Sequence, residues 1–68
     1  QDNDALYNLA VTYLLIGNDQ SALPLLKLLT ERTPNNGVVW REIGGIYARQ
    51  GRLEDSTNAY KREEELKK

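Results

Sequence analysis

The sequence predicts an all-α fold of two stacked helix-turn-helix hairpins, an α-solenoid with four antiparallel helices. Three observations lead to this fold class. The chain repeats itself with a period of 34 residues, which aligns Tyr13 with Tyr47 and Gly17 with Gly51. Apolar residues recur at helical spacing in four segments, and glycine or proline breakers separate these segments. No alternating pattern of the kind found in β-strands competes with this interpretation.

The repeat also preserves residue size. The 34-residue shift places large residues on large ones and small residues on small ones, pairing Leu6 with Trp40, Leu9 with Ile43, Ala10 with Gly44, Ala22 with Ser56 and Leu26 with Tyr60. In arrays of this kind, each hairpin hides its apolar face only against a neighbour. We therefore expect one domain over residues 1–68, with repeats at about 3–36 and 37–68, taken from a longer array.

The first hairpin is expected to begin with a helix over about residues 4–16. The apolar stripe of this helix consists of Leu6, Leu9, Ala10, Tyr13 and Ile16. Gly17 and Asn18 follow it as a left-handed stop. The second helix starts with Asp19 or Ser21 as the residue that accepts from free backbone amides, and it ends near Arg32.

The stripe of the second helix consists of Ala22, Leu25, Leu26 and Leu29. Pro24 lies in its first turn or just beyond, where a missing amide costs less than in the middle of a helix.

The second hairpin follows a breaker segment, residues 33–37, in which a proline ends one helix and an asparagine caps the next. The third helix is expected over about residues 38–50, closed by Gly51, with a stripe of Trp40, Ile43, Gly44 and Tyr47. The fourth begins near Glu54 and turns Ser56, Ala59, Tyr60 and Glu63 inward. Its charged end carries two favourable i,i+4 pairs, Glu63 with Lys67 and Glu64 with Lys68.

Composition limits the chemistry available to the chain. It contains no cysteine and no histidine, which excludes disulfides, thiol catalysis and the commonest near-neutral acid/base and zinc ligand. Glu63, Glu64 and Glu65 are consecutive on a solvated helix and do not converge in a cleft. The serine, threonine and tyrosine side chains have no basic partner at a recognisable spacing. We expect no enzyme, no cofactor and no metal site.

Charge and hydropathy bear on the partners. Nine basic and ten acidic residues give a net charge of -1, which is too balanced to favour nucleic acid or an acidic membrane surface. The apolar runs fall far short of the roughly 20 residues needed to cross a bilayer. No basic patch followed by an apolar stretch indicates a signal peptide. We expect a soluble chain without membrane insertion, with the cytoplasm preferred to the periplasm as its location.

The second half of the chain resembles the tetratricopeptide repeat, whose pattern is W-x2-L-G-x2-Y with later small, aromatic and proline positions. The resemblance is carried by Thr33 to Trp40 and by Ile43, Gly44, Tyr47, Gly51, Ser56 and Tyr60. The first half resembles the same repeat with Leu6 in place of the tryptophan, so the likeness spans residues 3 to 68. Leu29 and Glu63 depart from it, because the family has a small residue there, and Glu64 replaces an aliphatic one.

The resemblance implies a scaffold module that binds a partner peptide or helix on the concave surface formed by the first helix of each repeat. The residues expected on this surface are Asp4, Tyr7, Val11, Leu14 and Leu15 from the first repeat and Val38, Arg41, Gly45, Ala48 and Arg49 from the second. One half of the surface is apolar and the other is small and cationic. A segment with an apolar anchor beside a carboxylate would suit it.

Plainer interpretations stay open for several of these residues. Arg41 and Arg49 are also typical of solvated surface charges, and the apolar residues of the first repeat are also suited to contacting a preceding repeat or a second copy. Self-assembly as a homodimer is therefore the alternative function, because two repeats have few internal interfaces. The residues without expected cover are Tyr7, Val11, Leu14, Leu25 and Leu28.

Overall fold

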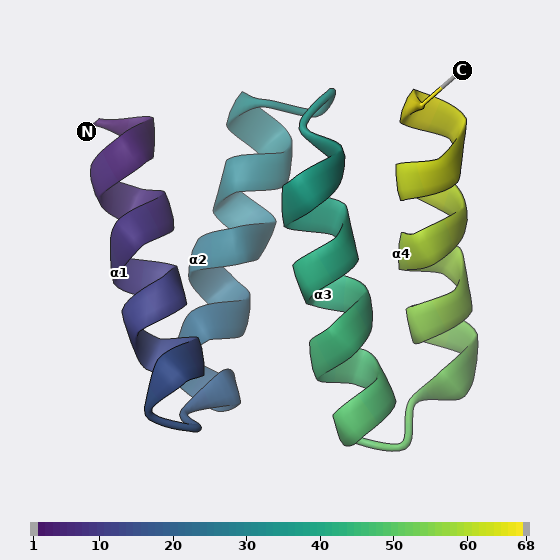
Figure 1. Ribbon diagram of the computed structural model, residues 1–68, viewed down its shortest axis with the longest axis horizontal. Helices are drawn as coiled ribbons and strands as arrows, with labels where there is room; N and C mark the ends of the chain where they lie inside the picture. Colours follow the sequence, from purple (N-terminus) through teal and green to yellow (C-terminus); the bar gives the residue numbers. More distant parts are fainter. Residues whose placement is uncertain (1, 68) are drawn as a thin grey trace.

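The computed structural model describes residues 2–67, which form four α-helices. These are α1 (Asn3–Leu15), α2 (Asp19–Arg32), α3 (Gly37–Arg49) and α4 (Leu53–Leu66). Consecutive helices run antiparallel and each packs against the next one in the chain (Figure 1). No strand occurs in residues 2–67. The predicted all-α fold of helical hairpins is confirmed, and the helix ends differ from those expected by about one residue.

The turns that close the two hairpins have the same backbone structure. Gly17 and Gly51 both adopt positive φ angles, 79° and 76°. The amide of Asn18 donates to the carbonyl oxygen of Tyr13 at 2.8 Å, and Arg52 donates to Tyr47 at 2.9 Å. Each glycine amide also donates to the residue three positions earlier, at 3.1 Å. This is the Schellman arrangement, in which glycine avoids the steric cost of a left-handed residue. The 34-residue period is thus a structural period as well.

Asparagine and aspartate side chains begin three of the helices. Asp2 accepts from the amide of Asp4 at 2.9 Å, and Asn36 accepts from Val38 at 3.1 Å. The expectation that Asp19 or Ser21 caps α2 is wrong, because Asn18 is the N-cap and accepts from the Ser21 amide at 3.2 Å. Asn18 therefore serves both elements: its backbone closes α1 and its side chain opens α2.

The core lies where α2 meets α3. Leu26 of α2 and Val39 and Ile46 of α3 are fully buried. Other buried residues around them are Leu6, Ala10, Ala22, Leu29, Ile43, Tyr47 and Ala59. Tyr13 and Trp40 are partly buried against this cluster. Burial of this apolar surface, at roughly 25 cal/mol per Å² removed from water, joins the two hairpins into one domain.

Three residues assigned to apolar stripes are more exposed than expected. Ile16 is 70% exposed, because it is the C-cap of α1 and lies beyond the helical stripe. Leu9 is 45% exposed, whereas its repeat equivalent Ile43 is only 3% exposed. Since α2 packs on α3, Ile43 is covered by the first hairpin, whereas no helix within residues 2–67 lies over the matching face of α1. Tyr60 is 41% exposed.

The absence of a side chain at Gly44 allows α4 to approach α3 closely. A methyl group placed on Gly44 would lie 3.1 Å from the ring of Tyr60. Ser56 of α4 donates to the carbonyl oxygen of Gly44 at 2.8 Å in a buried hydrogen bond. The exposed ring of Tyr60 therefore still packs with one face against the α3 backbone.

The charged end of α4 follows the predicted pairing where the structure describes it. Glu63 is 9% exposed and its Oε2 lies 3.7 Å from Lys67 Nζ and 3.8 Å from an Arg41 nitrogen. The predicted pair between Glu64 and Lys68 falls outside the described residues. Glu63 thus occupies a position expected to hold a small residue and is balanced there by two cations.

Candidate partner-binding groove

A groove of about 550 Å³ lies between α1 and α3. The residues that line it are Val11, Leu14, Leu15, Gly17, Asp19, Glu42, Gly45 and Arg49. No Cα atoms of α1 and α3 approach within 8 Å, since α2 packs against both helices (Figure 1). Side chains of the two helices therefore meet across the groove, and its walls stand on helices that the core holds in place.

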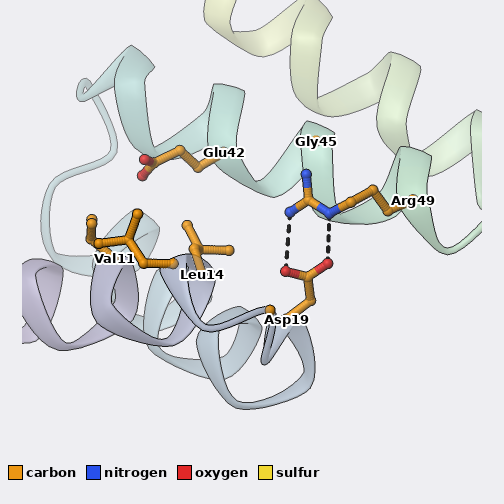
Figure 2. A pocket seen from close by; sticks show the side chains of 8 residues that line it. Val11, Leu14, Asp19, Glu42, Gly45 and Arg49 are labelled. Carbon is orange, nitrogen blue, oxygen red and sulfur yellow. Dashed lines mark hydrogen bonds and ion pairs between the residues drawn. The ribbon is translucent and has the colours of Figure 1, made fainter.

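The centre of the groove is apolar. Val11 and Leu14 of α1 face Glu42 and Gly45 of α3 (Figure 2). A methyl group added to Gly45 would lie 3.6 Å from Arg49 Nη1, an ordinary contact, so glycine is not required there by crowding. Its missing side chain leaves part of the groove empty, which makes room for a side chain of another molecule.

One end of the groove is closed by a bidentate ion pair. Arg49 donates from Nε to Asp19 Oδ2 at 2.7 Å and from Nη2 to Asp19 Oδ1 at 3.1 Å (Figure 2). The hydrogen bond to Asp19 raises the pKa of Arg49 above its ordinary value, so the guanidinium stays charged. The two charges neutralise each other and link α3 to the start of α2.

The other end of the groove carries a carboxylate, Glu42, that forms no ion pair among the described residues. Tyr7 donates from its hydroxyl to Glu42 Oε1 at 3.1 Å. Glu42 Oε2 is buried and has no hydrogen-bond partner among the described residues. Burial, and then the charge of Glu42 and this hydrogen bond, raise the pKa of the Tyr7 hydroxyl above its usual value. Tyr7 therefore remains a protonated donor at neutral pH.

The structure brings five of the ten predicted surface residues to this groove as lining residues: Val11, Leu14, Leu15, Gly45 and Arg49. Tyr7 joins them through its hydrogen bond to Glu42. Val38 and Arg41 line a different hollow beside Glu63 and Lys67. Asp4 and Ala48 are exposed and do not line the groove. The predicted surface is thus divided, and only its central part forms one groove.

Sequence reasoning missed Glu42 and Asp19. Glu42 had a signal, because the helical spacing Glu42, Gly45, Arg49 places all three on one face of α3. Asp19 had none, since it belongs to α2 and meets Arg49 only through the tertiary fold. These two residues change the charge of the predicted surface, because the groove contains two carboxylates and one guanidinium.

Comparisons with known proteins do not assign the chain to a family. Neither a scan of protein-family models nor a search of curated proteins found a match for this chain. Within residues 2–67, no group of three or more acidic side chains is arranged to hold a metal ion. The same part of the chain has no helix with the length and apolar character to span a membrane.

Proposed function

We propose that this chain is a protein-interaction module that holds a segment of a partner protein in the groove between α1 and α3. The observation that carries this proposal is the groove itself, about 550 Å³ with an apolar centre and polar ends. Binding sites for peptides and small ligands commonly combine such an apolar surface with a few placed polar groups. The role is binding without catalysis.

The resemblance to tetratricopeptide repeats supports the same proposal. In that family the first helix of each hairpin lines the ligand surface, and here Val11 and Leu14 belong to the first helix and Gly45 to the third. The identical turns at Gly17 and Gly51 agree with two copies of one structural unit. We infer that the chain is a pair of such repeats and that its groove continues in a longer array.

A substitution that fills the groove tests the proposal. A displayed library of peptides of about seven residues is panned against the immobilised wild-type chain, and the selected peptides are then measured against Gly45→Leu. The leucine side chain would occupy the space above Gly45, so we expect at least a tenfold loss of affinity. Thr57→Leu, on the exposed side of α4, adds the same side chain elsewhere and should bind normally.

Circular dichroism is used to check that both variants remain helical. Failure to select any peptide that competes in solution would overturn the proposal, as would equal affinity for the wild-type chain and Gly45→Leu.

Self-association is the second candidate. Of the residues expected to lack cover, Tyr7, Leu14, Leu25 and Leu28 are partly buried against the core, and Val11 lines the groove together with Leu14. The surface we consider for association is the outer side of α1, where Asp2, Ala5, Leu6 and Leu9 line a hollow of about 300 Å³. Leu9→Lys should abolish association through this face, and sedimentation across a dilution series measures it. A wild-type chain that stays monomeric at high concentration excludes this function.

A further inference from the structure

The groove has one more negative than positive charge among its lining residues, because Asp19 and Arg49 neutralise each other and Glu42 remains. Asp19 and Arg49 form a bidentate pair at 2.7 and 3.1 Å and leave no net charge at their end. Arg41, the other cation expected on this surface, lies beside Glu63 at 3.8 Å in a separate hollow. Glu42 is therefore the lining charge without an ionic partner in the described part of the chain.

The state of Glu42 is unfavourable in the free chain. Its Oε1 accepts from the Tyr7 hydroxyl, while its Oε2 is buried and has no hydrogen-bond partner within residues 2–67. A buried polar oxygen that has lost water without gaining a hydrogen bond lowers stability, and the cost is larger when the oxygen is charged. A cation delivered to this oxygen would recover that free energy, so the groove is organised to gain more from a basic ligand than from a neutral one.

We propose that the partner segment places a lysine or arginine side chain on Glu42 and an adjacent apolar side chain against Val11, Leu14 and Gly45. This inference rests on the proposed function and specifies the chemistry of its ligand. Figure 2 shows the Glu42 carboxylate turned away from Arg49, toward the opposite end of the groove. The two carboxylate oxygens share the negative charge, so a cation that reaches Oε1 beside the Tyr7 hydroxyl also offsets the charge on the buried Oε2.

An acidic ligand suits the groove less well than the sequence suggested. Arg49 would have to leave Asp19 in order to bind a ligand carboxylate, and the ligand charge would then share the groove with Asp19 and Glu42. Like charges in a partly desolvated site repel one another. A basic ligand keeps the existing ion pair and adds a charge-assisted hydrogen bond, which is stronger than a neutral one.

The amino-acid composition of the peptides selected from the displayed library tests this inference. The same displayed library is panned in parallel against the wild-type chain, Glu42→Gln and Glu64→Gln. Glutamine at position 42 keeps an oxygen to accept from Tyr7 and removes the negative charge. Glu64 is exposed on α4, so Glu64→Gln removes the same charge without touching the groove.

We expect lysine and arginine next to an apolar residue to be enriched by the wild-type chain and by Glu64→Gln, but not by Glu42→Gln. The selected peptides should also lose at least tenfold in affinity for Glu42→Gln, which corresponds to about 1.4 kcal/mol. This inference would be overturned if Glu42→Gln selected peptides as rich in lysine and arginine as those of the wild-type chain. It would also be overturned if the wild-type chain enriched acidic residues. Either result would leave the proposed function standing. A panning that yields no binding peptide would overturn both.

Discussion

The Tyr7 hydroxyl donates to Glu42 Oε1 at 3.1 Å and so connects α1 directly to α3, two helices whose backbones are not in contact. This hydrogen bond lies at the charged end of the groove. It couples the ionisation of Tyr7 to the fold and holds the carboxylate that we assign to a basic ligand. The first two predictions follow from this pair.

Tyr7 should make the fold sensitive to alkaline pH. Burial, followed by the charge of Glu42, raises the pKa of Tyr7 above its ordinary value of 10.0. The folded chain therefore holds this proton more tightly than the unfolded chain does. The contribution to stability is complete below pH 10.0 and is lost as pH rises through the folded-state pKa.

Urea unfolding at about pH 9 and about pH 11 measures this effect. The decrease in the free energy of unfolding from the lower to the higher pH should be smaller in Tyr7→Phe than in the wild-type chain. Equal decreases in the wild-type chain and Tyr7→Phe would contradict the account of Tyr7.

Glu42→Gln should leave the free chain at least as stable as wild type at neutral pH. The amide keeps an oxygen for the Tyr7 hydroxyl, and it replaces a charged oxygen that is buried without a partner. Thermal unfolding followed by circular dichroism provides the comparison, with Glu64→Gln as the charge-matched control. A loss of more than about 1 kcal/mol would mean that Glu42 already has a stabilising partner.

Two adjacent glycines should respond to alanine in opposite directions. Gly45→Ala removes a flexible residue from a helix without crowding, so we expect a gain of about 0.5–1 kcal/mol. Gly44→Ala should lower stability despite the same gain in helix propensity. Its methyl group would lie 3.1 Å from the Tyr60 ring, while the Ser56 hydrogen bond at 2.8 Å keeps α4 close. Urea denaturation of Gly44→Ala and Gly45→Ala measures the two free energies of unfolding. Equal changes in both variants would show that α4 can move away from α3 to accept the methyl group.

Leu9 and Ile43 occupy equivalent repeat positions and should differ sharply in their cost of truncation. Ile43 is 3% exposed, so Ile43→Ala should cost about 2–5 kcal/mol. Leu9 is 45% exposed, so Leu9→Ala should cost under about 1 kcal/mol in the monomer. If Ile43→Ala fails to fold, Ile43→Val, at about 0.5–1.5 kcal/mol, keeps the comparison measurable. Similar costs at both positions would indicate that the outer face of α1 is covered in solution.

Much of the fold could be predicted because its local rules act within short segments. The 34-residue pairing of Gly17 with Gly51 determined both hairpin turns, and helical spacing placed the elements to within about one residue. The exposure of Leu9 could not be read from its stripe. It depends on whether another helix lies over α1, and the same stripe in α3 is covered by α2.

The candidate site was only partly predictable for a related reason. Val11, Leu14 and Gly45 were identified because helix faces follow from spacing. The charge balance of the groove depends on Arg49 reaching Asp19, 30 positions earlier and on another helix. Such a pairing carries no local signal, so the sequence suggested a cationic surface where the structure has a neutralised arginine and a carboxylate that forms no ion pair among the described residues.

The most direct test of the groove is the position of a bound peptide. Nuclear Overhauser effects between a library-selected peptide and the methyl groups of the wild-type chain measure it in solution. We predict contacts from the apolar side chain of the peptide to Val11 and Leu14, with the basic side chain near Tyr7. A bound peptide that contacts Leu9 on the outer side of α1, and neither Val11 nor Leu14, would contradict the account.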